Sequence, residues 1–242
     1  MKYWSASARA AENWVEVPPG YRKSHAWTPQ IGDIFPNFNV QSTQGKIAFH
    51  NWAEGGWVYL FSHPAAFTPI CTTELASMAM MLQDFEEAGV SVAAISMSGQ
   101  EEAARWVADV EDTFGLDVDF PVMSDPGGRI SREMGLIHSK ADAGCTIRKS
   151  FIIDPSLKLR MMFDYPASVG RSSEEALRAT LALQASDRTS LGVPADWQPG
   201  DDLLARASDC GDADLDVRYG RKWTRMCDYL KVVHAGAVDW PA

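Results

Sequence analysis

The sequence predicts an α/β fold in which a mixed sheet is flanked by helices and followed by a C-terminal extension. Short apolar runs bounded by glycine and polar residues alternate with segments whose apolar residues recur at three- and four-residue steps. A pair of strands then precedes one long helix, after which proline, glycine and aspartate break the pattern. These observations favour one main domain built from layers of strands and helices.

The first strand, helix and strand lie between 57 and 96. "WVYLF" at 57–61 and "VSVAAIS" at 90–96 are typical of buried strands. Gly89 stands where the C-terminal cap of the intervening helix is expected. The apolar face of that helix consists of Leu75, Met78, Ala79, Leu82 and Phe85.

A second helix, a hairpin and a third helix complete the main domain. The helix "GQEEAARWVADVEDTF" follows Ser98, and its apolar side consists of Trp106, Val107, Val110 and Phe114. "KSFIIDPSLKLRMMF" predicts two strands joined at Asp154-Pro155, and "SSEEALRATLALQ" predicts a helix that begins with a capping box from Ser172 to Glu175. This order of elements suits a thioredoxin-like fold.

The chain divides into an N-terminal arm at 1–28, the main domain at 29–190 and an extension at 191–242. The arm contains Trp4, Trp14 and Trp27. The extension is too polar and too broken by proline and glycine to fold alone. A monomer would leave its apolar residues in water, which predicts a homodimer. These residues are Trp197, Trp223, Tyr229, Leu230 and Trp240.

Composition excludes several classes of function. The formal net charge of −10, with Lys and Arg scattered among 32 acidic residues, disfavours binding to nucleic acid. The longest apolar runs are strand-sized, which predicts no membrane span. The first residues lack a continuous apolar stretch and include Arg9 and Glu12, so we expect no secretory signal and a cytoplasmic protein.

Four cysteines are present: Cys71, Cys145, Cys210 and Cys227. None forms a C-x-x-C pair, and no histidine spacing places two ligands on a helix face beside a cysteine, so we expect no metal site. A cytoplasmic chain of this length is a poor candidate for a disulfide scaffold. At least one cysteine is therefore expected to be a reactive thiol.

Cys71 stands at a predicted helix start in "HPAAFTPICTTEL". Unpaired N–H groups and the positive end of the helix dipole favour a thiolate there, but they supply too little stabilisation alone, so a cation should lie nearby. Thr68 can bring its hydroxyl to the sulfur, and Pro64 can shield it. The alternative is that Cys71 is a small apolar residue of the core.

The stretch around Cys71 resembles the peroxiredoxins, whose active-site loop has the form P-x-x-x-T-x-x-C, here Pro64, Thr68 and Cys71. "FSHPAAFTPICTTEL" is most similar to the one-Cys subfamily. "IGDIFPNF", "FPVMSD", "TIRKSFIIDP", "YPASVGRSSEEALRATLALQ" and "VPADWQPGDD" also resemble segments of that family in the same order. The resemblance spans about 31–202 and implies a thioredoxin-like fold.

The resemblance implies roles for individual residues. Cys71 would attack the peroxide, Thr68 would hold its distal oxygen, and Arg148 would supply the positive charge that the thiolate requires. Glu74 and Arg171 match supporting positions, and Glu74 would orient an arginine. The alternative for Arg148 is a solvated strand residue.

His63 matches a histidine that flanks the loop in the subfamily. It could equally be a core histidine that only satisfies a backbone carbonyl.

The implied activity is that of a thiol-dependent peroxidase that reduces hydrogen peroxide and alkyl hydroperoxides through a cysteine sulfenic acid, with no cofactor. An external thiol would complete the cycle, although Cys227 or Cys210 in the extension could instead form a disulfide with Cys71. The resemblance also implies a homodimer, which could assemble into a larger ring. The alternatives are an oligomeric holdase or a peroxide sensor on the same fold. A dithiol oxidoreductase is disfavoured, because Thr73 and Glu74 follow Cys71 instead of a second cysteine.

Overall fold

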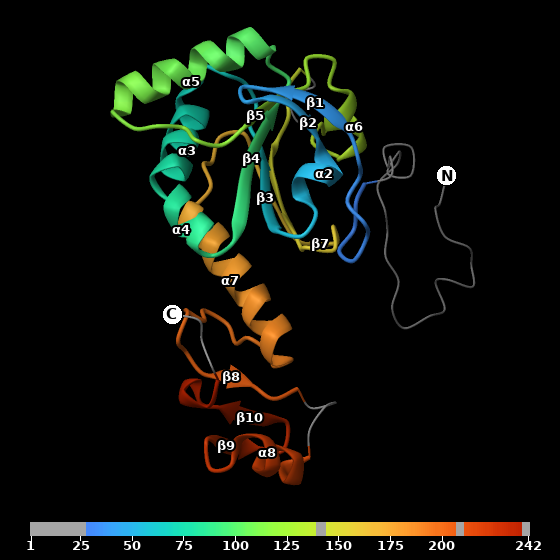
Figure 1. Cartoon of the computed structure of the whole chain (residues 1–242), viewed down its shortest axis with the longest axis vertical. Coiled ribbons are helices and arrows are strands. Elements are labelled where there is room, and N and C mark those ends of the chain that lie inside the picture. Colours follow the sequence, from blue (N-terminus) through green and yellow to red (C-terminus); the bar gives the residue numbers. More distant parts are fainter. Residues whose placement is uncertain (1–27, 139–143, 207–210, 239–242) are drawn as a thin grey trace, which may run out of the picture.

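The computed structural model describes residues 28–138, 144–206 and 211–238. Its main feature is a seven-stranded sheet with the order β2-β1-β5-β4-β3-β6-β7 (Figure 1). The strands are β1 (Asn39–Ser42), β2 (Gly45–Ala48), β3 (Trp57–Ser62), β4 (Val90–Ser96), β5 (Val122–Ser124), β6 (Arg148–Ile153) and β7 (Leu159–Tyr165). β3, β4 and β5 are parallel, whereas β6 and β7 form an antiparallel hairpin on one side of them.

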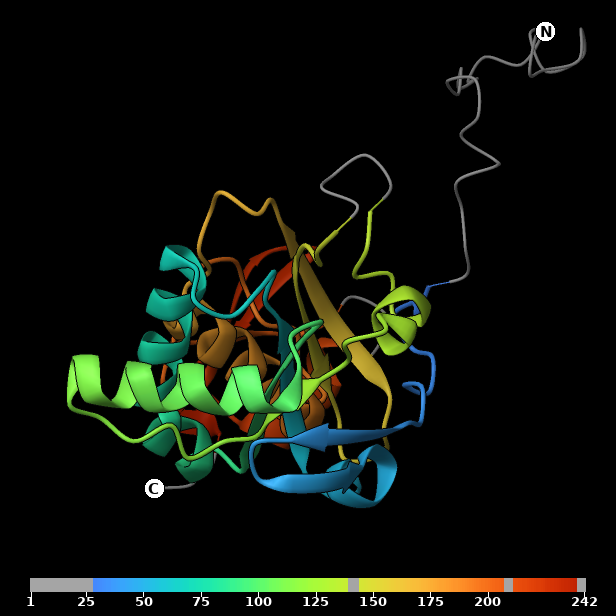
Figure 2. The ribbon, with the colours of Figure 1, turned by 90° about the horizontal axis from the view of Figure 1, so that it is seen from above.

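Helices cover both faces of this sheet, and the view from above in Figure 2 shows the two layers. One face carries α3 (Pro69–Met80), α4 (Leu82–Glu87), α5 (Gln100–Phe114) and α7 (Ser173–Thr189). The other face carries α2 (Phe49–Ala53) and α6 (Arg129–Glu133). Because strand side chains alternate, Tyr59 and Phe61 of β3 pack under the first layer, and Val58 and Leu60 pack under the second. The predicted mixed sheet with helices on both faces is confirmed.

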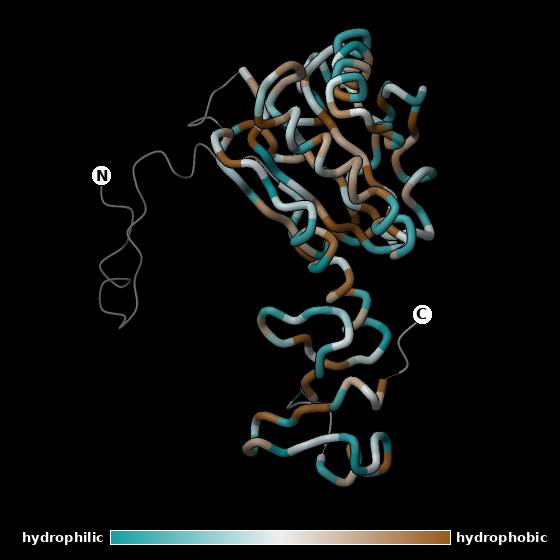
Figure 3. Tube along the Cα trace, turned by 90° about the vertical axis from the view of Figure 1, so that its left-hand side faces the viewer, coloured by the Kyte–Doolittle hydropathy of each residue, from teal (hydrophilic) through white to brown (hydrophobic). Residues whose placement is uncertain are grey.

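The central strands are buried on both faces, and Figure 3 shows hydrophobic residues running through the middle of the main domain. The strand predicted at 90–96 is β4, and Ser172 caps α7 by accepting a hydrogen bond from the Glu175 N–H at 3.1 Å. The helix predicted from Leu75 to Phe85 is instead two helices, α3 and α4, separated at Met81. Phe114, predicted on a buried face, is 46% exposed at the end of α5.

The extension forms a small unit at the far end of α7 (Figure 1). It contains β8 (Leu203–Leu204), α8 (Asp212–Tyr219), β9 (Trp223–Cys227), β10 (Leu230–Val233) and the 3₁₀ turn η2 (Ala235–Ala237), with a sheet order of β8-β10-β9. Its own apolar cluster packs around Trp197, which is 2% exposed.

The prediction that Trp197 would face water in a monomer is therefore wrong, because the end of α7 and the small sheet cover it. Tyr229 is 79% exposed, as predicted for a monomer. Trp4, Trp14 and Trp27 of the arm, and Trp240 of the extension, lie outside the described residues.

Candidate active site

Cys71 is the third residue of α3 and its side chain is completely buried. Thr68 has extended backbone angles at the N-cap, and Pro69 is the first helical residue, where its missing N–H costs no hydrogen bond. The sulfur therefore lies within the first turn, whose N–H groups have no partner inside the helix. This position favours a negatively charged sulfur.

The predicted cation is in place. Arg148, the first residue of β6, is 2% exposed and donates from Nη1 to the Cys71 sulfur at 3.2 Å. The same nitrogen donates to Glu74 Oε2 at 2.6 Å, and Nε donates to the Ala167 carbonyl at 2.9 Å. Three contacts thus fix the guanidinium beside the sulfur, and the solvated alternative for Arg148 is wrong.

Glu74 lies one helical turn after Cys71 and holds both arginines. Arg171 donates to Glu74 Oε1 from its backbone N and from Nε, both at 2.9 Å, and to Oε2 from Nη2 at 2.9 Å. A further bond from Arg171 Nη1 reaches the Lys149 carbonyl at 3.1 Å. The Arg171 guanidinium also lies over the Phe61 ring, 5.0 Å from its centroid. We call Glu74, Arg148 and Arg171 the Glu74 network.

The Glu74 network places an excess of positive charge beside the Cys71 sulfur. The side chains of Glu74 and Arg171 are each 5% exposed, and that of Arg148 is 3% exposed, so solvent screens them weakly. One carboxylate faces two guanidinium groups, which leaves one positive charge over. This excess charge is buried, where an uncompensated charge is costly, and it lies beside the Cys71 sulfur.

Thr68 and Pro64 flank the sulfur within the loop, and both are half-buried. The Thr68 hydroxyl donates to the Ala65 carbonyl at 3.0 Å rather than to the Cys71 sulfur, which differs from the contact expected from the sequence. Its oxygen lone pairs remain able to accept a hydrogen bond. Phe67 lies between Pro64 and Thr68 in the sequence and is 51% exposed. Its φ of 55° is a left-handed conformation that is uncommon for a bulky residue.

His63 is 1% exposed and faces the aromatic ring of Trp106, with centroids 4.8 Å apart. Neither of its ring nitrogens has a hydrogen-bond partner among the described residues. Burial, reinforced by the charges of Arg171 and Arg148, lowers the pKa of His63 to about 3. The alternative of a core histidine whose ring bonds to a backbone carbonyl is therefore not supported by these hydrogen bonds. The backbone carbonyl of His63 itself accepts from the Thr146 hydroxyl at 2.9 Å.

Two contacts, one to the loop and one to the first turn of α3, come from α5 and the turn before it, and neither was predicted from the sequence. The Ser98 hydroxyl accepts from the Ala66 N–H at 3.1 Å, although Ser98 seemed only to precede a helix. The Trp106 Nε1–H donates to the Thr72 hydroxyl at 3.0 Å. The apolar periodicity of α5 placed Trp106 on the buried side, but no signal in the sequence indicated its partner.

The other cysteines are Cys145, Cys210 and Cys227. Cys145 and Cys227 are half-buried and form no disulfide bond with a described residue, and Cys210 lies outside the described residues. Arg171, which contacts Glu74, precedes the 17-residue helix α7, and the extension packs at the opposite end of that helix. A helix of this length spans about 25 Å, far more than the roughly 7 Å between the α-carbons of a disulfide. Cys227 and Cys71 of one chain therefore lie at opposite ends of α7.

Solved structures share this architecture. The structure of a yeast mitochondrial 1-Cys peroxiredoxin is 31% identical with a TM-score of 0.79, covering 84% of this chain and 98% of that one. A mutant of peroxiredoxin 6 of Arenicola marina is also 31% identical with a TM-score of 0.79, covering 85% and 98%. The fold is therefore thioredoxin-like, as the sequence predicted, and the fold and site together define a thiol peroxidase.

Sequence comparisons identify the family. Residues 31–162 match the AhpC/TSA family. A peroxiredoxin of Thermoplasma volcanium is 40% identical over 177 residues, 73% of this chain and 86% of that protein. A 1-Cys peroxiredoxin of Medicago truncatula is 35% identical over 178 residues, 72% and 82% of the two chains. The chain belongs to the AhpC/TSA family and is a peroxiredoxin, which confirms the predicted thiol-dependent peroxidase and does not favour the holdase or sensor alternative.

Two further findings concern the described residues. None of their helices combines the length and apolar character needed to cross a bilayer. Within the same ranges, no group of three or more His, Cys, Asp or Glu side chains is arranged to hold a metal ion.

Proposed function

We propose that Cys71 is the thiolate that reduces hydrogen peroxide and small alkyl hydroperoxides in this peroxiredoxin. The observation that carries the proposal is the 3.2 Å contact between Arg148 Nη1 and a fully buried sulfur in the first turn of α3. The arginine supports the thiolate before the reaction and meets the negative charge that develops on the peroxide oxygen during it. Thr68 accepts a hydrogen bond from the peroxide hydroxyl.

In the proposed reaction, the Cys71 thiolate attacks the distal oxygen and the O–O bond breaks. The bonding pair leaves with the proximal oxygen, which takes up a proton to form water or an alcohol, and Cys71 becomes a sulfenic acid. A neutral His63 stays beside the two arginines without adding a third positive charge. His63 therefore does not act as a cation in this mechanism.

An external thiol then reduces the sulfenic acid. Its sulfur attacks Cys71, water leaves, and a second thiol breaks the resulting mixed disulfide. The separation of Cys227 from Cys71 by the length of α7 supports an external reductant over a disulfide within one chain. A disulfide with Cys227 or Cys210 of a second subunit is the alternative.

A homodimer is part of the proposal, and it could assemble into a larger ring. β7 is the last strand of the main sheet. Gly32 and Asp33 bond to its first residue, Leu159, and beyond that residue no described strand pairs with its outer edge. Unpaired edges invite a second chain. Met226 and Tyr229 of the extension are 65% and 79% exposed, and they add apolar surface that a partner could cover. Light scattering that finds a stable monomer at micromolar concentration would contradict this assembly.

A cytoplasmic location completes the proposal. The cysteines that the structure describes form no disulfide bond with one another, which suits a reducing compartment.

The central test is peroxide consumption with a thiol reductant by the Cys71→Ser variant. We expect activity to fall to the background rate, because every turnover requires that sulfur. The Cys145→Ser and Cys227→Ser variants are matched controls that should keep the wild-type rate. A second measurement, peptide mapping without reductant after one equivalent of peroxide, distinguishes the two cycles. Abundant Cys71 linked to Cys227 or Cys210 would replace the external thiol with an internal one.

A further inference from the structure

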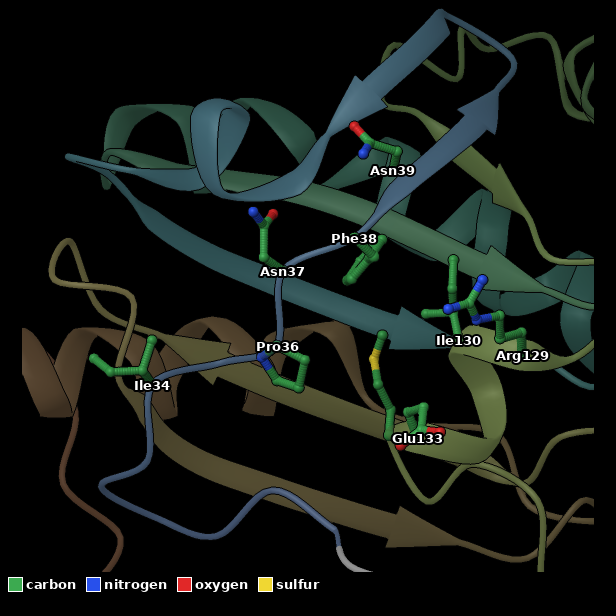
Figure 4. A pocket seen from close by; sticks show the side chains of 9 residues that line it. Ile34, Pro36, Asn37, Phe38, Asn39, Arg129, Ile130 and Glu133 are labelled. Atoms are coloured by element: carbon green, nitrogen blue, oxygen red, sulfur yellow. The ribbon is translucent and has the colours of Figure 1, made fainter.

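An apolar groove lies on the face of the main domain away from α3. One wall is the segment before β1, with Ile34, Pro36 and Phe38, and the other wall is α6 with Ile130 and the adjoining Met134 (Figure 4). Its volume is about 520 Å³, within the range of roughly 300–1,000 Å³ that is usual for ligand pockets. None of these residues belongs to the Cys71 site.

The polar groups of the groove suit a peptide. Asn37 and Asn39 line one wall. Asn37 Oδ1 accepts from the His50 N–H at 3.1 Å, and the Asn37 amide nitrogen and the Asn39 amide can bond to a peptide backbone. Arg129 and Glu133 lie four residues apart on α6, both are exposed, and neither forms an ion pair with a described residue. An apolar floor with one cation, one anion and two amides at its edges matches a segment that carries both aromatic and charged side chains.

The course of the chain before β1 directs its own N-terminal arm toward this groove. The Asp33 N–H donates to the Gln30 carbonyl at 3.0 Å, and Gly32 has φ of 99°, which together define a type II turn that reverses the chain. Beyond the turn, Thr28 lies so close to Gly135 that a Cβ on that glycine would be 2.5 Å from the threonine Cγ2. Gly135 directly follows Met134 of the groove. Thr28, the first described residue, therefore lies beside the end of α6 that borders the groove.

The last residues of the arm have the matching chemistry. "YRKSHAW" at 21–27 carries Tyr21 and Trp27 for an apolar floor, and Arg22 and Lys23 for Glu133. Ile34, at the rim of the groove, is 54% exposed in the described residues. We infer that residues 21–27 occupy the groove of their own chain, with an arm aromatic ring between Phe38 and Ile130 and with the Arg22–Lys23 pair beside Glu133.

Limited trypsin digestion, followed by mass spectrometry of the full-length protein, tests this inference, because the arm contains its own reference site. Trypsin can cut after Arg9, outside the docked segment, and after Arg22 or Lys23, inside it. Docking should slow cleavage at the inner sites, because cleavage then tracks the undocked population. We expect Glu133→Lys and Ile130→Gln each to raise the inner rate by about tenfold or more while leaving the Arg9 rate unchanged.

The matched control is Glu102→Lys, which makes the same charge change on the exposed side of α5 and should alter neither rate. The inference is overturned if neither groove variant changes the ratio of inner to outer cleavage. It is also overturned if the protection of the inner sites disappears on dilution, since the occupant would then be the arm of a second copy. Peroxidase activity, measured on the same samples, reports separately on the Cys71 site.

Discussion

Two carboxylates in this protein each join two cations, one in the active site and one in the extension. Glu74 bonds to Arg148 and Arg171, and all three side chains are at most 5% exposed. Asp212 of α8 bonds to Arg225 at 3.0 Å and to Lys231 at 2.6 Å, with 39% of the Asp212 side chain exposed. The hydrogen bond from Lys231 lowers the pKa of Asp212. The geometry is similar, but the surroundings are not.

The difference shows that burial, not the number of ion pairs, determines what a charge cluster can do. Water already solvates the Asp212 cluster, so its pairs add little. The Glu74 network is buried and has lost its hydration, and this loss is offset only when its hydrogen bonds are complete. The same loss makes its excess positive charge effective on the Cys71 sulfur, whereas a surface arginine would be screened.

The largest expected effect is from Glu74→Gln, which removes the carboxylate that two buried guanidinium groups share. We expect a loss of about 3–5 kcal/mol in the free energy of unfolding, together with most of the peroxidase activity. Asp212→Asn, the equivalent change in the extension, should leave the unfolding midpoint and the activity nearly unchanged. Urea titration of both variants checks this. Equal losses would contradict the comparison.

Arg148→Lys keeps the charge but not the shape of the guanidinium. A lysine cannot reach the sulfur, Glu74 and the Ala167 carbonyl at once from a planar fork. We expect kcat/KM for hydrogen peroxide to fall by about 10²–10³-fold, the usual cost of losing a preorganised donor. Arg160→Lys, which disturbs an ion pair with Asp187 away from the sulfur, is the control and should keep full activity.

The sequence predicted some elements of the fold and missed others. The long periodic segments predicted β3, β4, β6, β7, α5 and α7, because burial of a repeating face leaves a pattern. The hairpin β1–β2, and the short elements α2, β5 and α6, were not predicted, since three to five residues carry too little periodicity. The packing of the extension around Trp197 was also missed, because it depends on contacts between distant segments.

The residues of the site were predicted through a resemblance, and their contacts were only partly predicted. A requirement for a cation beside Cys71 followed from charge alone and is met by Arg148. The bonds that join Ser98 to the loop and Trp106 to α3 connect residues 32 and 34 positions apart, and no local pattern encodes such pairs.

Thr68→Val tests whether the Thr68 hydroxyl, three residues before Cys71, takes part in peroxide reduction. Loss of an acceptor for the peroxide should slow peroxide reduction by more than about tenfold, whereas Thr68→Ser should retain most of the rate. Thr73→Val is a matched control, because the Thr73 hydroxyl also donates to the carbonyl three residues earlier, that of Ile70, but faces solvent. Stopped-flow kinetics of all three variants measures the effect, and a full-rate Thr68→Val enzyme would remove the hydroxyl from the mechanism.

His63 should make the protein sensitive to acid. Its pKa is about 3 in the folded state, well below the ordinary 6.5, so between these values the unfolded state binds a proton that the folded state does not. Stability should therefore fall by roughly 1 kcal/mol per pH unit as the pH drops below about 6.5. His63→Phe keeps an aromatic ring against Trp106 and should flatten this dependence. Parallel stability curves for the two proteins between pH 4 and 7 would show that other groups are responsible.

The smallest effects are expected at the two ends of α7, the helix that joins the regions compared above. Ser172→Ala removes the hydroxyl that accepts from the Glu175 N–H and should cost about 1 kcal/mol of stability. Ser190 ends the helix with φ of 58°, a left-handed conformation that glycine adopts without strain, so Ser190→Gly should stabilise the protein by less than about 1 kcal/mol.

Neither change at the ends of α7 touches the charges of the Glu74 network, although Ser172 directly follows Arg171. Both variants should therefore retain the wild-type kcat/KM while their unfolding midpoints move in opposite directions. A large loss of activity in Ser172→Ala alone would mean that the helix cap helps to hold Arg171 against Glu74. The functional part of the buried network would then extend one residue beyond its ion pairs.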